Sequence, residues 1–209
     1  MPRELAIEIA SDVICPWCYI GKRRLEKALT LINGEAEPTL QWLPFELNPD
    51  MPAGGMPRAE YRRAKFGSPE RAKELDARVA AEGRTAGIEF AFDRIECTPN
   101  TRAAHELIDV AQLEGKANAV VDALFRAYFE EAKDIGDAAV LADIAARHEV
   151  SGWPGHARHT EVGALEEEVR RLGISAVPTF IFARRFGVSG AHPPENLAQA
   201  IRQALAEAS

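Results

Sequence analysis

The sequence has 209 residues, of which 46% are hydrophobic, and a formal net charge of −7 from 25 basic and 32 acidic residues. This length suits one domain, or one domain with a large insertion, and it can bury enough apolar surface to fold without disulfide bonds. The acidic balance argues against a general binder of nucleic acid or of anionic membranes. No apolar run is long enough to span a bilayer, and the charged opening from Met1 to Glu8 predicts no secretory signal.

The number of cysteines indicates the redox compartment in which the protein works. The chain has 3 cysteines, at positions 15, 18 and 97, whereas a disulfide-rich secreted scaffold needs a dense and even set. We therefore expect a reducing cytoplasm, where a pair of cysteines is more often catalytic or metal-binding than structural.

The first part of the chain predicts a parallel pair of strands. Leu5, Ile7 and Ile9 alternate with polar or small residues, which indicates a strand. Residues 16–32 carry apolar side chains at helical spacing, and residues 39–43 are β-branched, aromatic and apolar. A strand, a crossover helix and a second strand imply parallel pairing.

The middle of the chain predicts mainly helices. Residues 44–58 are rich in proline and glycine, which indicates a loop and a domain boundary. The mixed charges of residues 58–84 are typical of a solvated helix surface. Thr98 is expected to cap a helix that begins at Pro99, and Asp137 is expected to cap another.

The last part returns to an alternation of helix and strand. Residues 162–172 have a helical pattern that ends at a glycine, and residues 179–188 predict an antiparallel hairpin with a basic turn. Pro193 and Pro194 open a final amphipathic helix. The order of elements indicates an α/β fold that is interrupted by a helical block.

The most specific motif is Cys15-Pro16-Trp17-Cys18, between the first strand and the first helix. Unpaired N–H groups and the helix dipole favour a thiolate on Cys15, and Pro16 fits the first turn because its missing N–H would lack a partner. The two-residue spacing lets the sulfurs meet on one turn, so Cys15 should attack and Cys18 should resolve the mixed disulfide. Such a pair beside a βαβ pattern is typical of thioredoxin-like redox sites.

A proline far along the chain supports the same interpretation. Pro178 follows a helix that ends in glycine and directly precedes a predicted strand, which is where a thioredoxin fold carries a cis proline that faces the dithiol. The sequence does not show the isomer, and only about 5–6% of X–Pro bonds in folded proteins are cis.

Several segments together resemble the FrnE-like branch of the DsbA family. The strongest is Ser11-Asp12-Val13-Ile14-Cys15-Pro16-Trp17-Cys18-Tyr19-Ile20-Gly21-Lys22; the others are residues 44–49, Pro99-Asn100-Thr101 with His105, residues 177–180 and residues 188–191. The resemblance spans nearly the whole chain, and the segments occur in the family's order. It implies a thioredoxin-like fold, residues 1–52 and 160–209, with a large all-helical insertion domain, residues 53–159.

The resemblance also implies roles for individual residues. Cys15 would be the nucleophile and Cys18 its partner, with Pro178 as the cis proline and Val177 offering its backbone to a bound peptide. Pro16 would support the site, and Trp17 would both support it and contact substrate. The implied activity is disulfide exchange on proteins, without an organic cofactor, and glutathione or a thioredoxin-type reductant would serve as thiol partner. We expect the reductase or isomerase direction in a reducing cytoplasm. Some family members carry a second cysteine pair toward the C-terminus, but this chain has no cysteine after Cys97.

Two other chemistries use the same residues. Cys15, Cys18, His156 and His159 would make a zinc site by count, yet the His-x-x-His spacing is shorter than structural sites prefer, so we expect no metal. Glutathione-dependent relatives on this fold, the 2-hydroxychromene-2-carboxylate isomerases and kappa-class transferases, carry a serine at the position of Cys15. The dithiol therefore favours redox work.

The remaining candidate residues have structural interpretations that we prefer. Asn48, Asn100 and His105 could contact a small ligand, or they could be a turn residue, a first-turn helix residue and a partly buried helix residue. Asp12 could take a proton from Cys18, or its carboxylate could stabilise a turn through hydrogen bonds to the backbone. Cys97 has no cysteine neighbour and reads as a lone thiol.

A third class of function is a non-enzymatic peptide-binding or chaperone module. Such a module would use an exposed apolar surface around Trp17 and Pro178. It would keep its activity after Cys15→Ser, whereas an enzyme would lose it.

Overall fold

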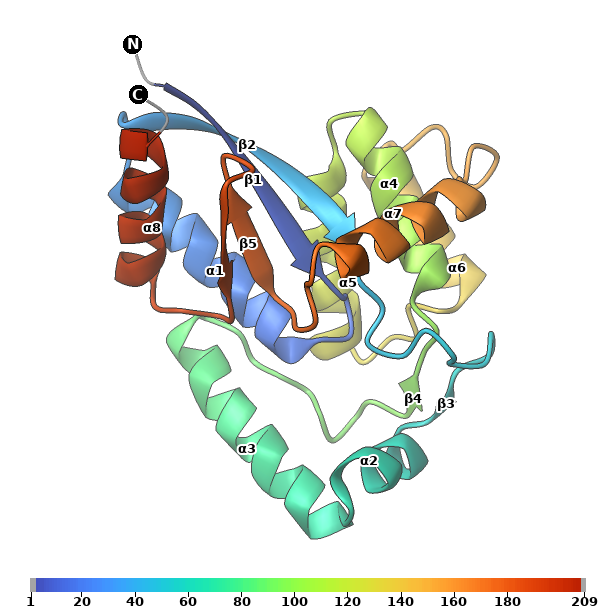
Figure 1. The fold of residues 1–209 in the computed structure, drawn as a ribbon. Helices are drawn as coiled ribbons and strands as arrows, with labels where there is room; N and C mark the ends of the chain where they lie inside the picture. The colour runs from blue at the N-terminus through green and yellow to red at the C-terminus, as the bar shows by residue number, and fades with distance from the viewer. Residues whose placement is uncertain (1–2, 208–209) are drawn as a thin grey trace.

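A four-stranded mixed sheet forms the centre of the molecule in the computed structural model, which describes residues 3–207 (Figure 1). Its order is β2–β1–β5–β6, with bounds Arg3–Ser11 for β1, Ala36–Pro44 for β2, Thr179–Phe182 for β5 and Phe186–Ser189 for β6. Strand β1 pairs parallel to β2 and antiparallel to β5, and β5 pairs antiparallel to β6. The predicted parallel pair and the predicted hairpin are both confirmed.

Helices cover both faces of this sheet. Helix α1 (Pro16–Leu31) and helix α8 (Pro194–Glu207) pack on one face, and α7 (His159–Arg171) packs on the other. The alternation of strand side chains produces this division. The face toward α1 and α8 carries fully buried apolar side chains, namely Ile7, Ile9, Phe180 and Phe182. On the opposite face Ala10 and Leu43 form a separate cluster with Val169 of α7.

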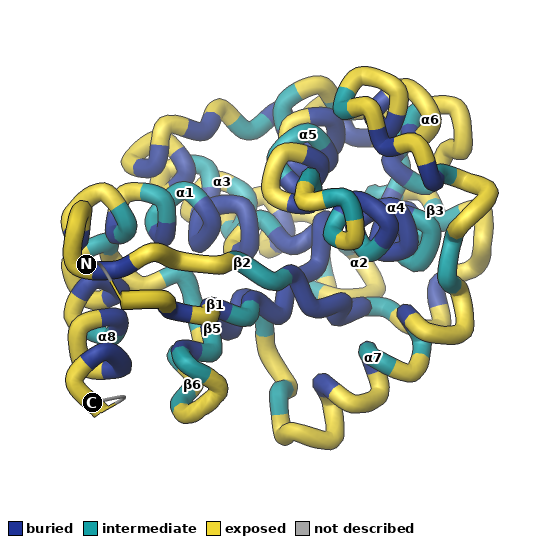
Figure 2. Tube along the Cα trace, turned by 90° about the horizontal axis from the view of Figure 1, so that it is seen from above, coloured by how far each residue is buried: buried dark blue, intermediate teal, exposed yellow. Residues whose placement is uncertain are grey.

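Seen from above, the buried strands run through the middle of the molecule, and the exposed surface lies on the outer sides of the helices (Figure 2). Within residues 3–207, no helix is both long and apolar enough to cross a bilayer.

Five helices lie between β2 and α7: α2 (Arg58–Phe66), α3 (Pro69–Thr85), α4 (Arg102–Leu113), α5 (Ala117–Phe129) and α6 (Ala138–Arg147). The charged stretch 58–84, predicted to be a solvated helix surface, contains two helices, because Gly67 has a φ of 88° and ends α2. Ser68 then caps α3 through Arg71 N. The cap at Asp137 is confirmed, since its carboxylate accepts a hydrogen bond from Ala139 N at 2.7 Å.

The predicted helix start at Thr98 is wrong. Thr98 pairs with Met56 in a two-residue antiparallel ladder formed by β3 (Met56–Pro57) and β4 (Cys97–Thr98). Helix α4 begins later, after a turn in which Asn100 Oδ1 accepts a hydrogen bond from Arg102 N at 2.9 Å. Thr98 therefore follows its hydrogen-bonded strand partner, which is distant in the sequence, and not the local capping signal. The inserted segment therefore holds a short strand pair as well as helices.

The helical block packs directly on α1. The ring of Tyr19 on α1 stacks on Phe125 of α5 with ring centroids 5.0 Å apart, and both residues are fully buried. One buried cluster joins β1 and α1 to α4, α5 and α6. The inserted helices thus pack against the start of α1, while the boundaries at residues 52 and 160 stay a prediction.

Candidate active site

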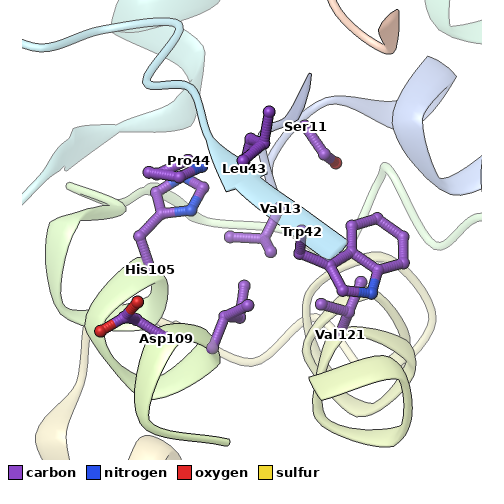
Figure 3. A pocket seen from close by; sticks show the side chains of 9 residues that line it. Ser11, Val13, Trp42, Leu43, Pro44, His105, Asp109 and Val121 are labelled. Atoms are coloured by element: carbon purple, nitrogen blue, oxygen red, sulfur yellow. The ribbon is translucent and has the colours of Figure 1, made fainter. Parts of the chain in front are cut away.

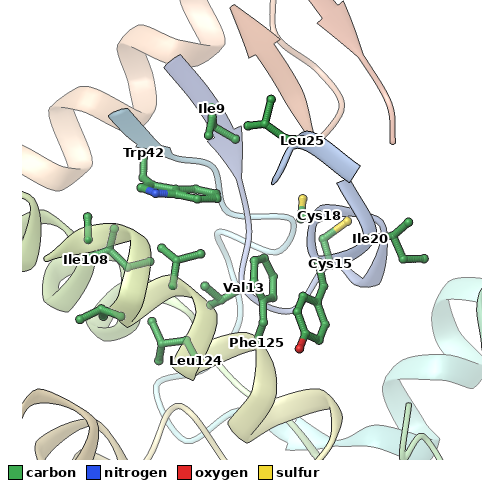
Figure 4. Packing of buried hydrophobic residues seen from close by; sticks show 14 of the residues in the cluster. Ile9, Val13, Cys15, Cys18, Ile20, Leu25, Trp42, Ile108, Leu124 and Phe125 are labelled. Atoms are coloured by element: carbon green, nitrogen blue, oxygen red, sulfur yellow. The ribbon is translucent and has the colours of Figure 1, made fainter. Parts of the chain in front are cut away.

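The two cysteines of the motif lie side by side where α1 begins (Figure 4). Cys15 is the N-cap residue, and the backbone N–H of Cys18 donates to its carbonyl oxygen at 3.0 Å. Both are free thiols, with 5% of Cys15 and 2% of Cys18 exposed. Cys15 lines a cleft at the surface, whereas Cys18 lies behind it against the core.

Burial raises the pKa of the Cys18 thiol well above its usual value, and the hydrogen bond and negative charge of Cys15 raise it further. Contacts with the Asp12 backbone and the Ser11 side chain lower it in part. The contribution of a charged Cys15 ends once that sulfur forms a mixed disulfide, because a disulfide sulfur carries no charge. Cys18 thus becomes a better nucleophile at the step that needs it.

The loop before β5 faces the dithiol. The Val177–Pro178 peptide bond is cis, and Cys15 Sγ lies 3.7 Å from the carbonyl oxygen of Val177. Helix α1 approaches this loop closely at Gly21, where an added Cβ would lie 2.8 Å from Pro178 Cγ. A side chain at Gly21 would therefore separate the helix from the proline. This contact was not predicted from the sequence, where its only signal is a glycine inside a predicted helix.

A cleft of about 420 Å³ opens beside Cys15. Pro16 and Trp17 form one wall, and Trp17 is 39% exposed. The opposite wall comes from α2 and α3, and α5 contributes Tyr128 and Phe129. Both motif residues predicted to support the site thus line a ligand-sized cleft.

Asp12 fastens the active-site turn to the loop after β2. Its carboxylate is fully buried, and Oδ2 accepts a hydrogen bond from Leu47 N at 2.7 Å while Oδ1 accepts one from Ile14 N at 3.4 Å. His105 Nε2 lies 3.6 Å from the same Oδ1. The carboxylate therefore accepts hydrogen bonds from two backbone N–H groups, the arrangement of a turn and a loop anchor, and the imidazole lies beyond hydrogen-bond distance.

Asn48 and Asn100 serve the loop that leads from β2 to α2. Asn48 Oδ1 accepts a hydrogen bond from Tyr61 at 3.1 Å, and Asn100 Nδ2 donates to the carbonyl of Met51 at 2.7 Å. Neither asparagine lines the cleft beside Cys15. Their contacts position the loop and α2 relative to the dithiol.

His105 faces a very small internal cavity of about 10 Å³ (Figure 3). Four of its lining residues carry a buried polar atom without a hydrogen-bond partner among the described residues: Ser11 Oγ, Trp42 Nε1, His105 Nε2 and Asp109 Oδ2. This volume is about that of one water molecule and excludes an organic ligand. His105 therefore serves the interior of the protein rather than the cleft.

The histidines proposed for a zinc site do not lie beside the two cysteines in an arrangement that could hold a metal ion. His159 Nδ1 contacts Glu106 at the start of α7, and across residues 3–207 no group of three or more His, Cys, Asp or Glu side chains is arranged to hold a metal ion. Cys97 lies in β4, where burial and then the charge of Asp134 raise its pKa to about 11.

The helix surface predicted to be solvated is partly the wall of the cleft. Arg58, Arg62, Lys65 and Arg78 all line it. A signal was present in the sequence, because Tyr61–Lys65 and Arg62–Phe66 are aromatic–cation pairs at i,i+4 spacing, and each cation lies over its ring. Without the fold, nothing connected these pairs to Cys15.

Comparison with known proteins defines the class. Residues 6–202 match the DSBA-like thioredoxin domain, so the chain belongs to this family. The thioredoxin-like fold with its helical insertion, and the resemblance to the DsbA family, are both confirmed. The finer assignment to the FrnE-like branch stays a prediction.

Solved structures agree with this assignment. A probable DsbA oxidoreductase from Streptomyces coelicolor is 32% identical, with a TM-score of 0.88 over 97% of this chain and 91% of that chain. The cytosolic disulfide reductase DsbM from Pseudomonas aeruginosa, which also has a structure with GSH, is 18% identical with a TM-score of 0.69 over 96% and 98% of the two chains. A 2-hydroxychromene-2-carboxylate isomerase is 16% identical with a TM-score of 0.65 over 98% and 99%. The latter two share the fold, and the family as a whole supports thiol–disulfide oxidoreduction.

Proposed function

We propose that this protein catalyses thiol–disulfide exchange on protein or glutathione disulfides through Cys15 and Cys18. One observation carries the proposal: the Cys15 thiol, at the start of α1, lies 3.7 Å from the carbonyl that precedes Pro178 and at the edge of a ligand-sized cleft. A thiol, a nearby backbone carbonyl and room for a substrate thus occur together. The reaction needs no cofactor beyond the two sulfurs.

In the reducing direction, the thiolate of Cys15 attacks one sulfur of a substrate disulfide. The substrate S–S bond breaks, a mixed disulfide with Cys15 forms, and the second substrate sulfur leaves as a thiolate that takes a proton from solvent. The thiolate of Cys18 then attacks the Cys15 sulfur and releases the first substrate sulfur. The substrate has gained two electrons, the pair is oxidised, and a thiol reductant of the glutathione or thioredoxin type must return it to the dithiol.

We favour the reductase or isomerase direction, in the cytoplasm. The sequence has only 3 cysteines, which fits a protein made for a reducing compartment. The cytosolic relative DsbM is described as a disulfide reductase. In this role Val177 and Trp17 would contact the substrate, and Pro16 and Pro178 would hold the site together.

Glutathione-dependent isomerisation is the second candidate, because an isomerase of this type shares the fold. Activation of glutathione requires one group that stabilises its thiolate, and a second thiol in the protein adds nothing to that task. The buried Cys18 beside Cys15 therefore favours exchange. A peptide-binding module without chemistry would require neither sulfur.

A redox titration of the Cys15–Cys18 pair against glutathione, run beside an insulin-reduction assay, tests the proposal. We expect one two-electron transition for the pair, and insulin reduction that disappears in Cys15→Ser. A pair that neither cycles nor reduces insulin would overturn the proposal and leave the isomerase. Insulin binding without any reduction by the wild-type protein, unchanged in Cys15→Ser, would instead indicate the peptide-binding module.

A further inference from the structure

The cleft beside Cys15 concentrates positive charge. Four cationic side chains line it, namely Arg58, Arg62, Lys65 and Arg78, and Asp76 is the only carboxylate in the lining. The whole chain has a net charge of −7, so this sign is a local property of the cleft. A cleft of one sign with low-dielectric walls focuses the field on a ligand of opposite charge.

Asp76, the single carboxylate of the lining, forms ion pairs with two of the four cations, and the other two can bind a ligand. Asp76 pairs with Arg62 at 2.5 Å and with Arg58 at 3.5 Å. Lys65 Nζ donates to the hydroxyl of Tyr61, and it pairs with no carboxylate of the described chain. The side chain of Arg78 is exposed and forms no ion pair or hydrogen bond with any residue from 3 to 207.

Aromatic rings hold three of these cations in place, and one of the three is Arg58, whose guanidinium lies 5.4 Å from the ring centre of Phe92. The Arg62 guanidinium lies 4.3 Å from the ring centre of Phe66, and Lys65 Nζ lies 5.0 Å from that of Tyr61. Such stacking restricts long side chains before a ligand arrives, which lowers the entropic cost of binding.

Two buried polar atoms of the lining lack a partner within the described structure. Thr98 Oγ1 belongs to a residue that is 1% exposed, and Arg62 Nε is buried as well. Both atoms lie behind the surface of the cleft, so the cationic side chains of the lining would be the groups that meet a ligand.

We propose that this cleft selects substrates with a carboxylate close to the reacting cysteine, and that Lys65 and Arg78 provide the selectivity. This inference rests on the proposed exchange at Cys15. While the substrate sulfur is bonded to Cys15, its carboxylate occupies the cationic cleft. A carboxylate of this kind occurs in a small peptide thiol and in an acidic protein segment, and the experiment distinguishes the two sources.

The test compares three aliphatic disulfides of different charge: dithiodipropionate, hydroxyethyl disulfide and cystamine. Each kcat/KM is divided by the rate at which free dithiothreitol reduces the same disulfide, so that intrinsic reactivity cancels. We expect the normalised values to fall from the anion to the neutral compound to the cation, and the spread to shrink in high salt.

The variant Lys65→Gln/Arg78→Gln should lower the ratio of dithiodipropionate to cystamine turnover by about tenfold, the scale of a lost charge-assisted contact. Arg63→Gln is the matched control, since Arg63 is an exposed cation of α2 that does not line the cleft. It should leave the ratio unchanged. Equal normalised rates for all three disulfides, or an equal loss of selectivity in Arg63→Gln, would overturn the inference.

Failure of this inference differs from failure of the proposed function. If neither insulin nor any of the three disulfides is reduced, exchange at Cys15 is wrong. If insulin is reduced but the three disulfides are reduced without regard to charge or not at all, only the selectivity is wrong. A peptide disulfide with Glu on either side of its cysteine, compared with the Gln version and with glutathione disulfide, then identifies the source. A preference for the Glu peptide over both supports an acidic protein segment, and a preference for glutathione disulfide supports a small peptide thiol.

Discussion

The thiol of Cys15 lies 3.7 Å from the backbone carbonyl oxygen of Val177, a residue 162 positions away in the sequence. This contact brings the start of α1 and the loop before β5 to one point. Under the proposed exchange, a substrate sulfur bonded to Cys15 would lie next to the Val177 carbonyl and beside the cleft.

The first prediction follows from the order of the two sulfurs. Cys18→Ser should accumulate a mixed disulfide at Cys15 with a peptide or glutathione, because no second sulfur resolves it. Intact-mass spectrometry without reductant measures the adduct, and dithiothreitol should remove it. Cys15→Ser should form no adduct at Cys18, which lies behind the surface and whose pKa is raised by burial. An adduct at Cys18 in that variant would reverse the assigned roles.

The second prediction concerns the contact between α1 and Pro178. Gly21→Ala places a Cβ 2.8 Å from Pro178 Cγ and 3.2 Å from Phe180 Cζ, both in a packed interior. Overpacking of this kind costs about 1–3 kcal/mol of unfolding free energy. Alanine gains roughly 0.5–1 kcal/mol of helix propensity over glycine, so the measured loss is a lower limit on the clash.

Urea unfolding and insulin reduction should both report this change, because the displaced element carries Cys15 or Pro178. Gly54→Ala is the control, since a Cβ there has no heavy atom within 4 Å. The control should alter neither measurement. A Gly21→Ala protein with unchanged stability and activity would show that α1 and Pro178 tolerate separation.

The sequence predicted the elements that depend on local or strongly periodic signals. The alternation of Ile7 and Ile9 is retained in β1, and the proline at the first turn of α1 marks the helix start correctly. The redox role of Cys15 and Cys18 was predicted from the position of their motif between this strand and this helix. Such features are specified by neighbours in the chain, so a single sequence contains them.

What the sequence did not predict depends on contacts distant in the chain. Thr98 followed by Pro99 is the sequence signal of a helix cap, but Thr98 pairs with Met56 and therefore lies in a strand. The cations Arg62 and Lys65 have the spacing of a solvated helix, but the fold of α2 and α3 turns them toward Cys15. Capping and charge patterns describe one element at a time, and they carry no information about which distant element faces it.

The third prediction addresses the lone cysteine. In Cys15→Ser/Cys18→Ser, Cys97 is the sole cysteine, and its pKa is raised to about 11. A raised pKa means less thiolate at a given pH. At pH 8 about one molecule in a thousand would carry the thiolate, against roughly a quarter for an unperturbed cysteine. Alkylation by iodoacetamide should therefore be at least about a hundredfold slower than in urea-unfolded protein.

The rate of this alkylation should rise about tenfold per pH unit from pH 7 to pH 9, since the thiolate fraction rises in that proportion below the pKa. The unfolded protein is the internal control, and its rate should begin to level off near the ordinary cysteine pKa of about 8.5. Rapid labelling of folded Cys97 at pH 7 would contradict the raised pKa and reopen a redox role for this thiol.

The last prediction separates the two interpretations of Asp12. Its carboxylate accepts hydrogen bonds from Leu47 N and Ile14 N in a fully buried position. Asp12→Asn keeps the shape but turns an NH₂ group toward one of these donors, which leaves a buried N–H unpaired at a cost of about 1–3 kcal/mol. As a turn and loop anchor, Asp12 should therefore affect stability while the pH profile of insulin reduction keeps its midpoint.

Urea unfolding and the pH profile of the exchange rate are measured on the same preparations. Asp143→Asn is the control, because Asp143 is an exposed aspartate that pairs with Arg147 on α6. It should leave both measurements unchanged. If Asp12 instead took the proton of Cys18, loss of the carboxylate would slow the resolving step and shift the midpoint to higher pH, with no loss of stability required. A displaced midpoint at unchanged stability would therefore make Asp12 the proton acceptor.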